Sequence, residues 1–248
     1  MFSPIIIYED NHLLIVKKPP GFLAQPDGRW LYKPVPGQSV PAKTPCGGVK
    51  PHLGPDGGPR PDLLTWAEEY LARDKPGRAF VGLVHRLDRA VGGVVALAKT
   101  SKCAARLSGQ FRERRVDKIY LALVESPPEY DEGRLEQVLV RDGTLTRPAR
   151  PGENGRAAAL EWKLRSRSDD LALLEIRLLT GFKHQIRAQL ASLGRPILGD
   201  AKYGSRVTGP GPAIGLWAET LGLDHPTTKE RLTFTTEPSA VWPWSLIK

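Results

Sequence analysis

The segment HRLDRAVGG, from His85 to Gly93, places charged side chains between RAFVGLV and GVVALAKT, two stretches with the composition of buried strands. A carboxylate at such a junction is either paired with a cation or used in chemistry, because an unpaired charge is costly to bury. Asp88 is therefore a candidate nucleophile or base. Taken alone, an aspartate in such a loop is most often a turn or ion-pair residue.

Other polar residues suit chemistry, although none identifies an enzyme by itself. His184 and Arg187 are three positions apart in KHQIRAQLASLG, so they share one face of a predicted helix. Tyr120, within KIYLALV, would by default be a core aromatic, and His85 a structural histidine. The phosphate-loop pattern GxxxxGK, the hydrolase pattern GxSxG and the zinc-protease pattern HExxH are absent.

The chain is basic, with 36 Lys and Arg against 27 Asp and Glu and a formal net charge of +9. This balance favours a polyanionic partner such as nucleic acid. Between residues 99 and 118 there are two acidic and seven basic side chains: Lys99, Lys102, Arg106, Arg112, Arg114, Arg115 and Lys118. They form either the solvated face of a helix or a stripe that contacts phosphates, and their placement opposite Leu107 and Phe111 favours the stripe.

The elements that must position these residues follow from hydrophobic periodicity. It predicts strands over 5–10, 12–19, 117–125, 158–168, 171–180 and 230–238, and helices over 62–73, 101–115 and 183–194. Asp62 and either Thr100 or Ser101 are the expected N-caps, and Gly194 is placed to end the third helix. Strands and helices mix without strict alternation, which favours an α+β sheet with helices packed against it.

Residues 26–61 differ from the rest of the chain, with 9 Pro and 7 Gly in 36 positions, and are predicted to form a coil or mobile insertion.

The length of 248 residues, 40% of them hydrophobic, is sufficient for a core without disulfides or metals. The two cysteines, Cys46 and Cys103, are too few for a disulfide framework or a set of zinc ligands. Neither a signal peptide nor an apolar run of about 18 residues is present. We therefore expect a reduced cytoplasmic protein that is not inserted in a membrane.

Taken together, three motifs in this order resemble the RluA-type pseudouridine synthases: HRLD with a following glycine turn, KIYLALV, and LLTGFKHQIRAQLASLGRPILGDAKYG. The opening YEDNHLLIVKKPPGFLAQP and the closing LDHPTTKERLTFTTEP are similar to the family as well. The resemblance implies the α+β pseudouridine synthase fold, with a mixed, mostly antiparallel sheet, flanking helices and a central cleft. It implies one catalytic domain over 1–248, with 26–61 as an insertion. Because the opening strand begins at about Ile5, we expect no S4-like domain before it.

The activity implied by the resemblance is isomerisation of uridine in RNA to pseudouridine, without a cofactor or a metal, by a protein that we expect to be a monomer. The resemblance implies Asp88 as the catalytic aspartate, Arg187 as its partner and Tyr120 against the target base. The carboxylate could attack C1′, stabilise positive charge there, or take the 2′ proton, and the residues do not choose among these. Ribosomal RNA is the first expectation for the target, and transfer RNA the second.

Eight residues are predicted to contact RNA: His85, Arg86, Arg89, Lys118, His184, Gln185, Arg112 and Arg115. Arg86 has a specific expected role. A uridine inside folded RNA must leave its stack, and the planar guanidinium of Arg86 could occupy the vacated space.

Three departures from the family pattern bear on function. The turn after HRLD has Gly92 where serine is usual, Phe182 stands where the family has arginine, and Trp217 where histidine is common. The altered turn and Phe182 favour retaining a rival hypothesis, a catalytically inactive RNA-binding or ribosome-assembly protein with the same fold. A third and weaker hypothesis is a hydrolytic glycosylase that releases free uracil.

Overall fold

The computed structural model describes residues 3–26, 61–73 and 79–247. Its helices are α1 (Leu63–Ala72), α2 (Ser101–Arg112) and α3 (Gln185–Ser192), with 3₁₀ turns η1 (Ala201–Tyr203) and η2 (Trp244–Leu246). Its strands are β1 (Ile5–Glu9), β2 (Leu13–Lys18), β3 (Gly82–Leu83), β4 (Gly92–Ala98), β5 (Asp117–Glu125), β6 (Glu132–Asp142), β7 (Leu145–Pro148), β8 (Arg156–Arg167), β9 (Leu171–Leu178), β10 (Leu216–Asp224) and β11 (Arg231–Thr235). The predicted insertion lies, apart from its two end residues, outside the described residues.

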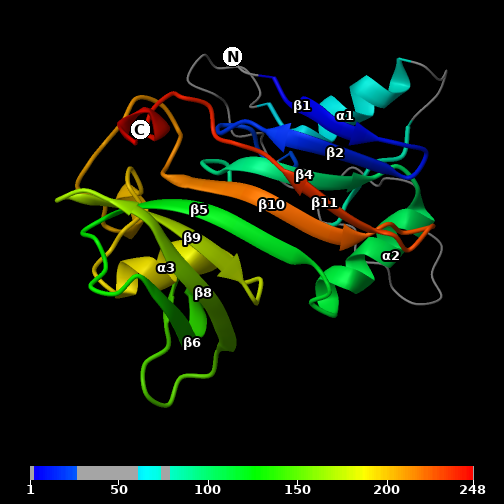
Figure 1. Cartoon of the computed structure of the whole chain (residues 1–248). Helices are drawn as coiled ribbons and strands as arrows, with labels where there is room; N and C mark the ends of the chain where they lie inside the picture. The colour runs from blue at the N-terminus through cyan, green and yellow to red at the C-terminus, as the bar shows by residue number, and fades with distance from the viewer. Residues whose placement is uncertain (1–2, 27–60, 74–78, 248) are drawn as a thin grey trace.

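One sheet contains all of these strands, in the order β1-β2-β4-β10-β5-β9-β8-β6-β7, with β11 beside β10 and β3 beside β4 (Figure 1). Every pairing is antiparallel except that of β4 with β10. The expected α+β class with a mixed, mostly antiparallel sheet is confirmed. Among the described helices, none is long and apolar enough to cross a membrane.

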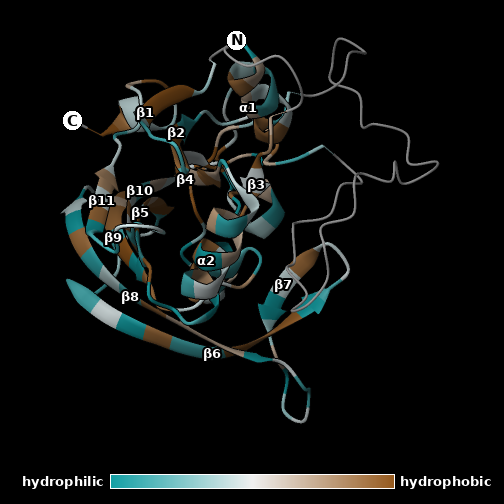
Figure 2. Ribbon diagram, turned by 90° about the vertical axis from the view of Figure 1, so that its right-hand side faces the viewer, coloured by the Kyte–Doolittle hydropathy of each residue, from teal (hydrophilic) through white to brown (hydrophobic). Residues whose placement is uncertain are grey.

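The helices begin where their caps were predicted. The Asp62 carboxylate accepts the backbone N–H of Thr65, and the Thr100 hydroxyl accepts that of Cys103, which satisfies donors that a helix start leaves free. The positive φ of Gly194, 72°, follows the end of α3, as expected for a C′ glycine. Figure 2 shows α1 and α2 on the same side of the curved sheet.

The two faces of β5 explain how the sheet positions the candidate site. Tyr120 packs against the main core on the helix side, together with residues of α2 and α3. Leu121 and Leu123 belong to a separate cluster with Trp217 and Trp244. Because successive side chains of a strand alternate between its faces, the register of β5 places Tyr120 on the helix side.

Two regions differ from the sequence prediction. In the described part of RAFVGLV, residues 79–84, only Gly82 and Leu83 pair with β4, and Val84 already belongs to the loop that carries Asp88. No element was predicted between 126 and 155, yet β6 and β7 form a hairpin there. The side chains of β6 are nearly all exposed or half-buried, so the strand lacks the apolar alternation that would have indicated it.

Candidate active site

The loop that carries Asp88 runs from residue 84 to 91 and is held at several points. The backbone N–H of Val91 donates to the carbonyl of Asp88 at 3.0 Å, closing a turn, and Gly21 N–H donates to the Arg89 carbonyl at 2.7 Å. His85 Nε2 accepts the N–H of Ala96 in β4 at 2.9 Å. The loop therefore presents Asp88 from a fixed backbone.

His85 itself has a structural place. Its ring stacks on Phe111 of α2, with centroids 4.6 Å apart and planes 19° from parallel. Burial, aided by the positive charge of Lys118, lowers the pKa of His85 to about 3, so the ring is neutral at pH 7 and Nε2 can accept. Contact between His85 and RNA stays a prediction.

Arg187 of α3 joins the Asp88 loop to η1. Its Nη1 donates to Asp88 Oδ2 at 3.0 Å, while Nε and Nη2 donate to the two oxygens of Asp200 at 2.6 and 2.7 Å. Burial by itself would lower the pKa of Arg187, but the hydrogen bonds and charges of Asp200 and Asp88 raise it. The predicted contact between Asp88 and Arg187, 99 positions apart, is thus present.

His184 precedes α3 and faces the same carboxylate. Its Nε2 lies 3.5 Å from Asp88 Oδ2, and its Nδ1 lies 2.9 Å from the hydroxyl of Tyr203. Burial lowers the pKa of His184 to about 4, although the charge of Asp88 acts in the opposite direction. His184 is therefore neutral at pH 7 and contacts Asp88 without adding charge.

Tyr120 and Lys118 reach this region from β5. Burial and then the negative charge of Asp88 raise the pKa of Tyr120, so its hydroxyl stays protonated at neutral pH. The ammonium of Lys118 donates to the Thr180 carbonyl at 3.2 Å, and burial lowers its pKa to about 8. The three predicted catalytic residues, Asp88, Arg187 and Tyr120, thus belong to one neighbourhood.

Lys18, at the end of β2, was not predicted from the sequence as a site residue. Its side chain is fully buried, and Nζ donates to the carbonyls of Pro19 and Phe22 at 3.1 and 3.0 Å. Burial lowers the pKa of Lys18 to about 7, and the charge of Asp88 opposes this shift. The available signal was a lysine pair that ends an apolar strand directly before a Pro-Pro-Gly turn.

The eight predicted RNA contacts differ in exposure, and three of them, His85, Lys118 and His184, are half-buried. Arg86, Arg89, Arg112 and Arg115 are exposed, the first two on the Asp88 loop and the others at the end of α2. Gln185 is buried instead: Oε1 accepts from Thr180 and Phe182, while Nε2 donates to Ala159 and Gln189. Direct contact of Gln185 with RNA stays an untested prediction.

Cations gather at the rim of the site. Lys183, which directly precedes His184, has its pKa lowered by burial and then by the charges of Arg141, Arg86 and Lys202, whereas Asp88 opposes the shift. These effects indicate that Arg86 of the Asp88 loop, Arg141 of β6 and Lys202 of η1 lie near enough to Lys183 to influence its charge. An anionic ligand would relieve the repulsion among them.

Two of the family departures, Gly92 and Trp217, form a single packing arrangement. The two residues are paired across β4 and β10, and a β-carbon on residue 92 would lie 2.1 Å from Cζ3 of Trp217. The indole Nε1 donates to the Thr236 carbonyl at 2.9 Å, which fixes the ring. The third departure, Phe182, has the guanidinium of Arg156 over its ring at 5.4 Å, so a cation is still present at this position.

Gly92→Ser, which introduces the residue usual in the family, should destabilise this protein. Overpacking a filled site costs about 1–3 kcal/mol, which lowers the melting temperature by several degrees in a chain of this size. A thermal melt measures the effect. Gly92→Ser combined with Trp217→His should lose less stability than the two single changes added together. A Gly92→Ser protein that melts like the parent would contradict this account of the departure.

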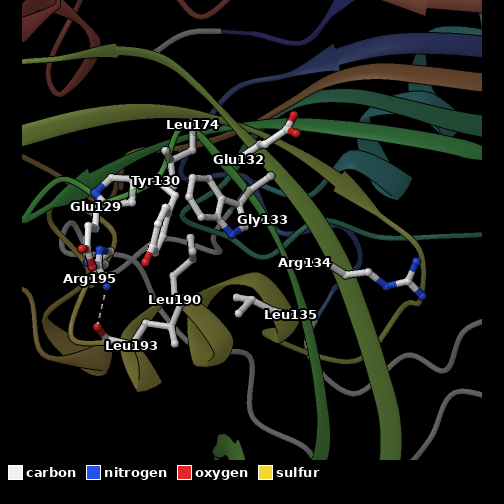
Figure 3. Close-up of a pocket in the computed structure, with 12 residues that line it drawn as sticks. Glu129, Tyr130, Glu132, Gly133, Arg134, Leu135, Leu174, Leu190, Leu193 and Arg195 are labelled. Carbon is white, nitrogen blue, oxygen red and sulfur yellow. Dashed lines mark hydrogen bonds between the residues drawn. The ribbon is translucent and has the colours of Figure 1, made fainter.

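A cavity of about 290 Å³ lies at the opposite end of α3 from His184 (Figure 3). Leu190, Leu193, Trp162 and Tyr130 line it, with Arg195 at its edge. None of the groups that surround Asp88 belongs to its lining.

The arrangement around Asp88 suits chemistry that uses one carboxylate oxygen. Arg187 and His184 both contact Oδ2, and among the described residues no group donates a hydrogen bond to Oδ1. Arg187 balances negative charge on Asp88. Oδ1 is consequently the oxygen that can attack an electrophilic carbon or accept a proton.

Comparison with known proteins gives consistent matches. The family model described as RNA pseudouridylate synthase matches residues 12–192. The dual-specificity RNA pseudouridine synthase RluA of Escherichia coli K12 is 31% identical over 237 residues, which cover 93% of this chain and 91% of that protein. An uncharacterised RNA pseudouridine synthase of Aquifex aeolicus is 29% identical over 96% of this chain and 72% of that protein.

Among solved structures, human RNA pseudouridylate synthase domain containing 4 has a TM-score of 0.69 at 23% identity. The match covers 97% of this chain and 91% of the human one. Human RNA pseudouridylate synthase domain containing 1 has a TM-score of 0.68 at 20% identity, over 97% and 85% of the two chains. At these identities the two structures support the fold.

Proposed function

Because this chain belongs to the RNA pseudouridylate synthase family and is of the RluA type, we propose that Asp88 is the carboxylate with which it isomerises uridine in RNA. Enzymes of this kind convert uridine within RNA to pseudouridine. The observation that carries the proposal is the approach of Arg187 to Asp88 at 3.0 Å, on a carboxylate whose other oxygen accepts no hydrogen bond from the described residues.

The reaction needs a group that assists at the ribose while the base is detached from C1′. The C1′–N1 bond must break, the uracil must turn, and C5 must bond to C1′ before the C5 proton leaves to water. Oδ1 of Asp88 can add to C1′ directly, stabilise positive charge there, or take the 2′ proton of the ribose. All three routes require the ionised carboxylate, which Arg187 stabilises electrostatically.

The other groups of the site have complementary roles in this proposal. Tyr120 remains a neutral phenol, so its ring can lie against the uracil while the base turns. The rim cations Arg86, Arg141, Lys183 and Lys202 contact RNA phosphates. Arg86 is exposed on the same loop as Asp88, and its planar head stacks in the space that a flipped uridine leaves.

For the target, ribosomal RNA ranks ahead of transfer RNA. The Escherichia coli relative is named a dual-specificity enzyme, which supports testing both. The test is to map pseudouridines in total RNA from cells with and without the gene, and to restore the gene on a plasmid. We expect at least one pseudouridine in ribosomal RNA to disappear and to return on restoration.

The outcomes separate the rival hypotheses. Loss confined to transfer RNA would overturn the preferred target and leave the reaction intact. If no pseudouridine disappears, and the purified protein releases no tritium from RNA labelled at uridine C5, the catalytically inactive RNA-binding protein is the better account. Release of free uracil would instead indicate a glycosylase.

A further inference from the structure

We propose that Tyr203 is a positioning residue for the reaction, which orients His184 so that its Nε2–H donates to Asp88 Oδ2 and leaves Oδ1 for the substrate. This inference rests on the proposed catalytic role of Asp88. It concerns a hydrogen-bonded chain from β7 through η1 to the Asp88 loop.

This series of hydrogen bonds begins at Thr146 in β7. Its backbone N–H donates to the Tyr203 hydroxyl at 2.9 Å, and its own hydroxyl donates to the Lys183 carbonyl at 2.7 Å. A phenol has one hydrogen to donate. In this proposal the Tyr203 hydroxyl, which accepts from Thr146, donates its hydrogen to His184 Nδ1, 2.9 Å away.

The direction of that hydrogen bond sets the tautomer of His184. A neutral imidazole carries one proton, so a ring whose Nδ1 accepts must carry its proton on Nε2. This nitrogen faces Asp88 Oδ2 at 3.5 Å, a distance that can shorten when substrate closes the site. Burial, and then the positive charges of Arg187, Lys183 and Lys202, lower the pKa of His184 to about 4 against the opposing charge of Asp88, so the ring is neutral at pH 7.

The backbone also favours this orientation. His184 has φ 56°, in the left-handed region that residues other than glycine seldom occupy. Strain of this kind persists where surrounding contacts hold it, often at functional sites. Here the Tyr203 hydroxyl holds the ring, and the Tyr203 ring also supports Arg187, whose guanidinium lies 4.9 Å from its centroid. Both groups that contact Asp88 Oδ2, His184 and Arg187, therefore also contact Tyr203.

Tyr203→Phe tests the inference because it removes the hydroxyl and keeps the ring beneath Arg187. We expect the single-turnover rate of tritium release to fall about 10- to 100-fold, with the Kd for RNA within about threefold of the parent. Nitrogen-15 NMR of the histidine side chains should show the Nε2–H tautomer of His184 in the parent and a mixture of tautomers in the variant. Losing a donor to the neutral ring should also raise the pKa of His184.

Two further variants make the result decisive. Tyr130→Phe removes a hydroxyl from a largely exposed tyrosine at the cavity of Figure 3 and should leave the rate unchanged. His184→Asn tolerates the left-handed backbone but is too short to reach Asp88 as the imidazole does. If Tyr203 acts through His184, the double variant should be no slower than His184→Asn alone.

Additive losses in the double variant, or an unchanged His184 tautomer in Tyr203→Phe, would overturn the inference. A thermal melt of each variant separates misfolding from mispositioning, and the NMR measurement does not depend on activity. If Asp88→Asn were fully active while the tautomer changed as expected, the proposed catalytic role would fail and the hydrogen-bonded chain would stand.

Discussion

Asp88→Asn should abolish uridine isomerisation while leaving the fold and RNA binding nearly intact. The amide keeps the shape of the carboxylate, but it can act neither as an anionic nucleophile nor as a proton acceptor. We expect the rate to fall at least about a thousandfold, which corresponds to about 4 kcal/mol in the barrier.

Stability should change little in Asp88→Asn, for a reason visible in the site. Arg187 keeps both hydrogen bonds to Asp200, so its buried guanidinium is not left unpaired. The side chain of Asp88 is also 24% exposed, so the loss should be about 1 kcal/mol. Without the charge of Asp88, repulsion of RNA phosphates decreases, and RNA binding should persist or tighten.

The measurement is single-turnover tritium release from RNA labelled at uridine C5, run beside an RNA-binding assay and a thermal melt. Asp170→Asn, a change of the same kind at an exposed aspartate in the turn between β8 and β9, is the matched control and should behave as the parent. If Asp88→Asn turns over within tenfold of the parent, Asp88 is not the catalytic group.

Arg187→Met should be the most destabilising single change at the site and should also abolish activity. It removes the cation between Asp88 and Asp200, and the side chain of Asp200 is only 2% exposed. Breaking a buried ion pair by removing one partner costs about 3–5 kcal/mol, because the remaining charge has no compensation. In a chain of this length that corresponds to a fall of about 10 °C in melting temperature.

A second substitution separates the effects of Arg187 on stability and on catalysis. Arg187→Met combined with Asp200→Asn removes the uncompensated buried charge, so thermal melts should show part of the lost stability restored. Tritium release should remain absent, because Asp88 still lacks its cation. A single Arg187→Met variant that melts within about 2 °C of the parent would show that the pair with Asp200 contributes little.

Local patterns in the sequence were sufficient for most of the elements. The caps Asp62 and Thr100 are present because a side-chain oxygen satisfies helix donors that have no other partner, an interaction within four residues. The hairpin of β8 and β9 likewise follows from two alternating segments with a short turn between them. The hairpin of β6 and β7 was missed, because β6 buries almost none of its side chains.

The identity of Asp88 as the candidate catalytic residue came from the sequence, through the HRLD motif and its order with KIYLALV and HQIR. The pairing of Gly92 with Trp217 could not be predicted from the sequence, because it depends on the register of β4 against β10. Together the two residues fill one space, which only the packed sheet reveals.

The tertiary structure alone decided which groups surround Asp88 and its two partners, Arg187 and His184. Arg187 was expected there by resemblance, but Lys18, Asp200 and Tyr203 were not, although each is an ordinary residue type at the end of a strand or in a turn. Their roles arise from burial and from contacts between segments far apart in the chain. Spacing along the chain determines which residues share one helix or strand face, and nothing in it specifies which faces meet once loops close and the sheet is assembled.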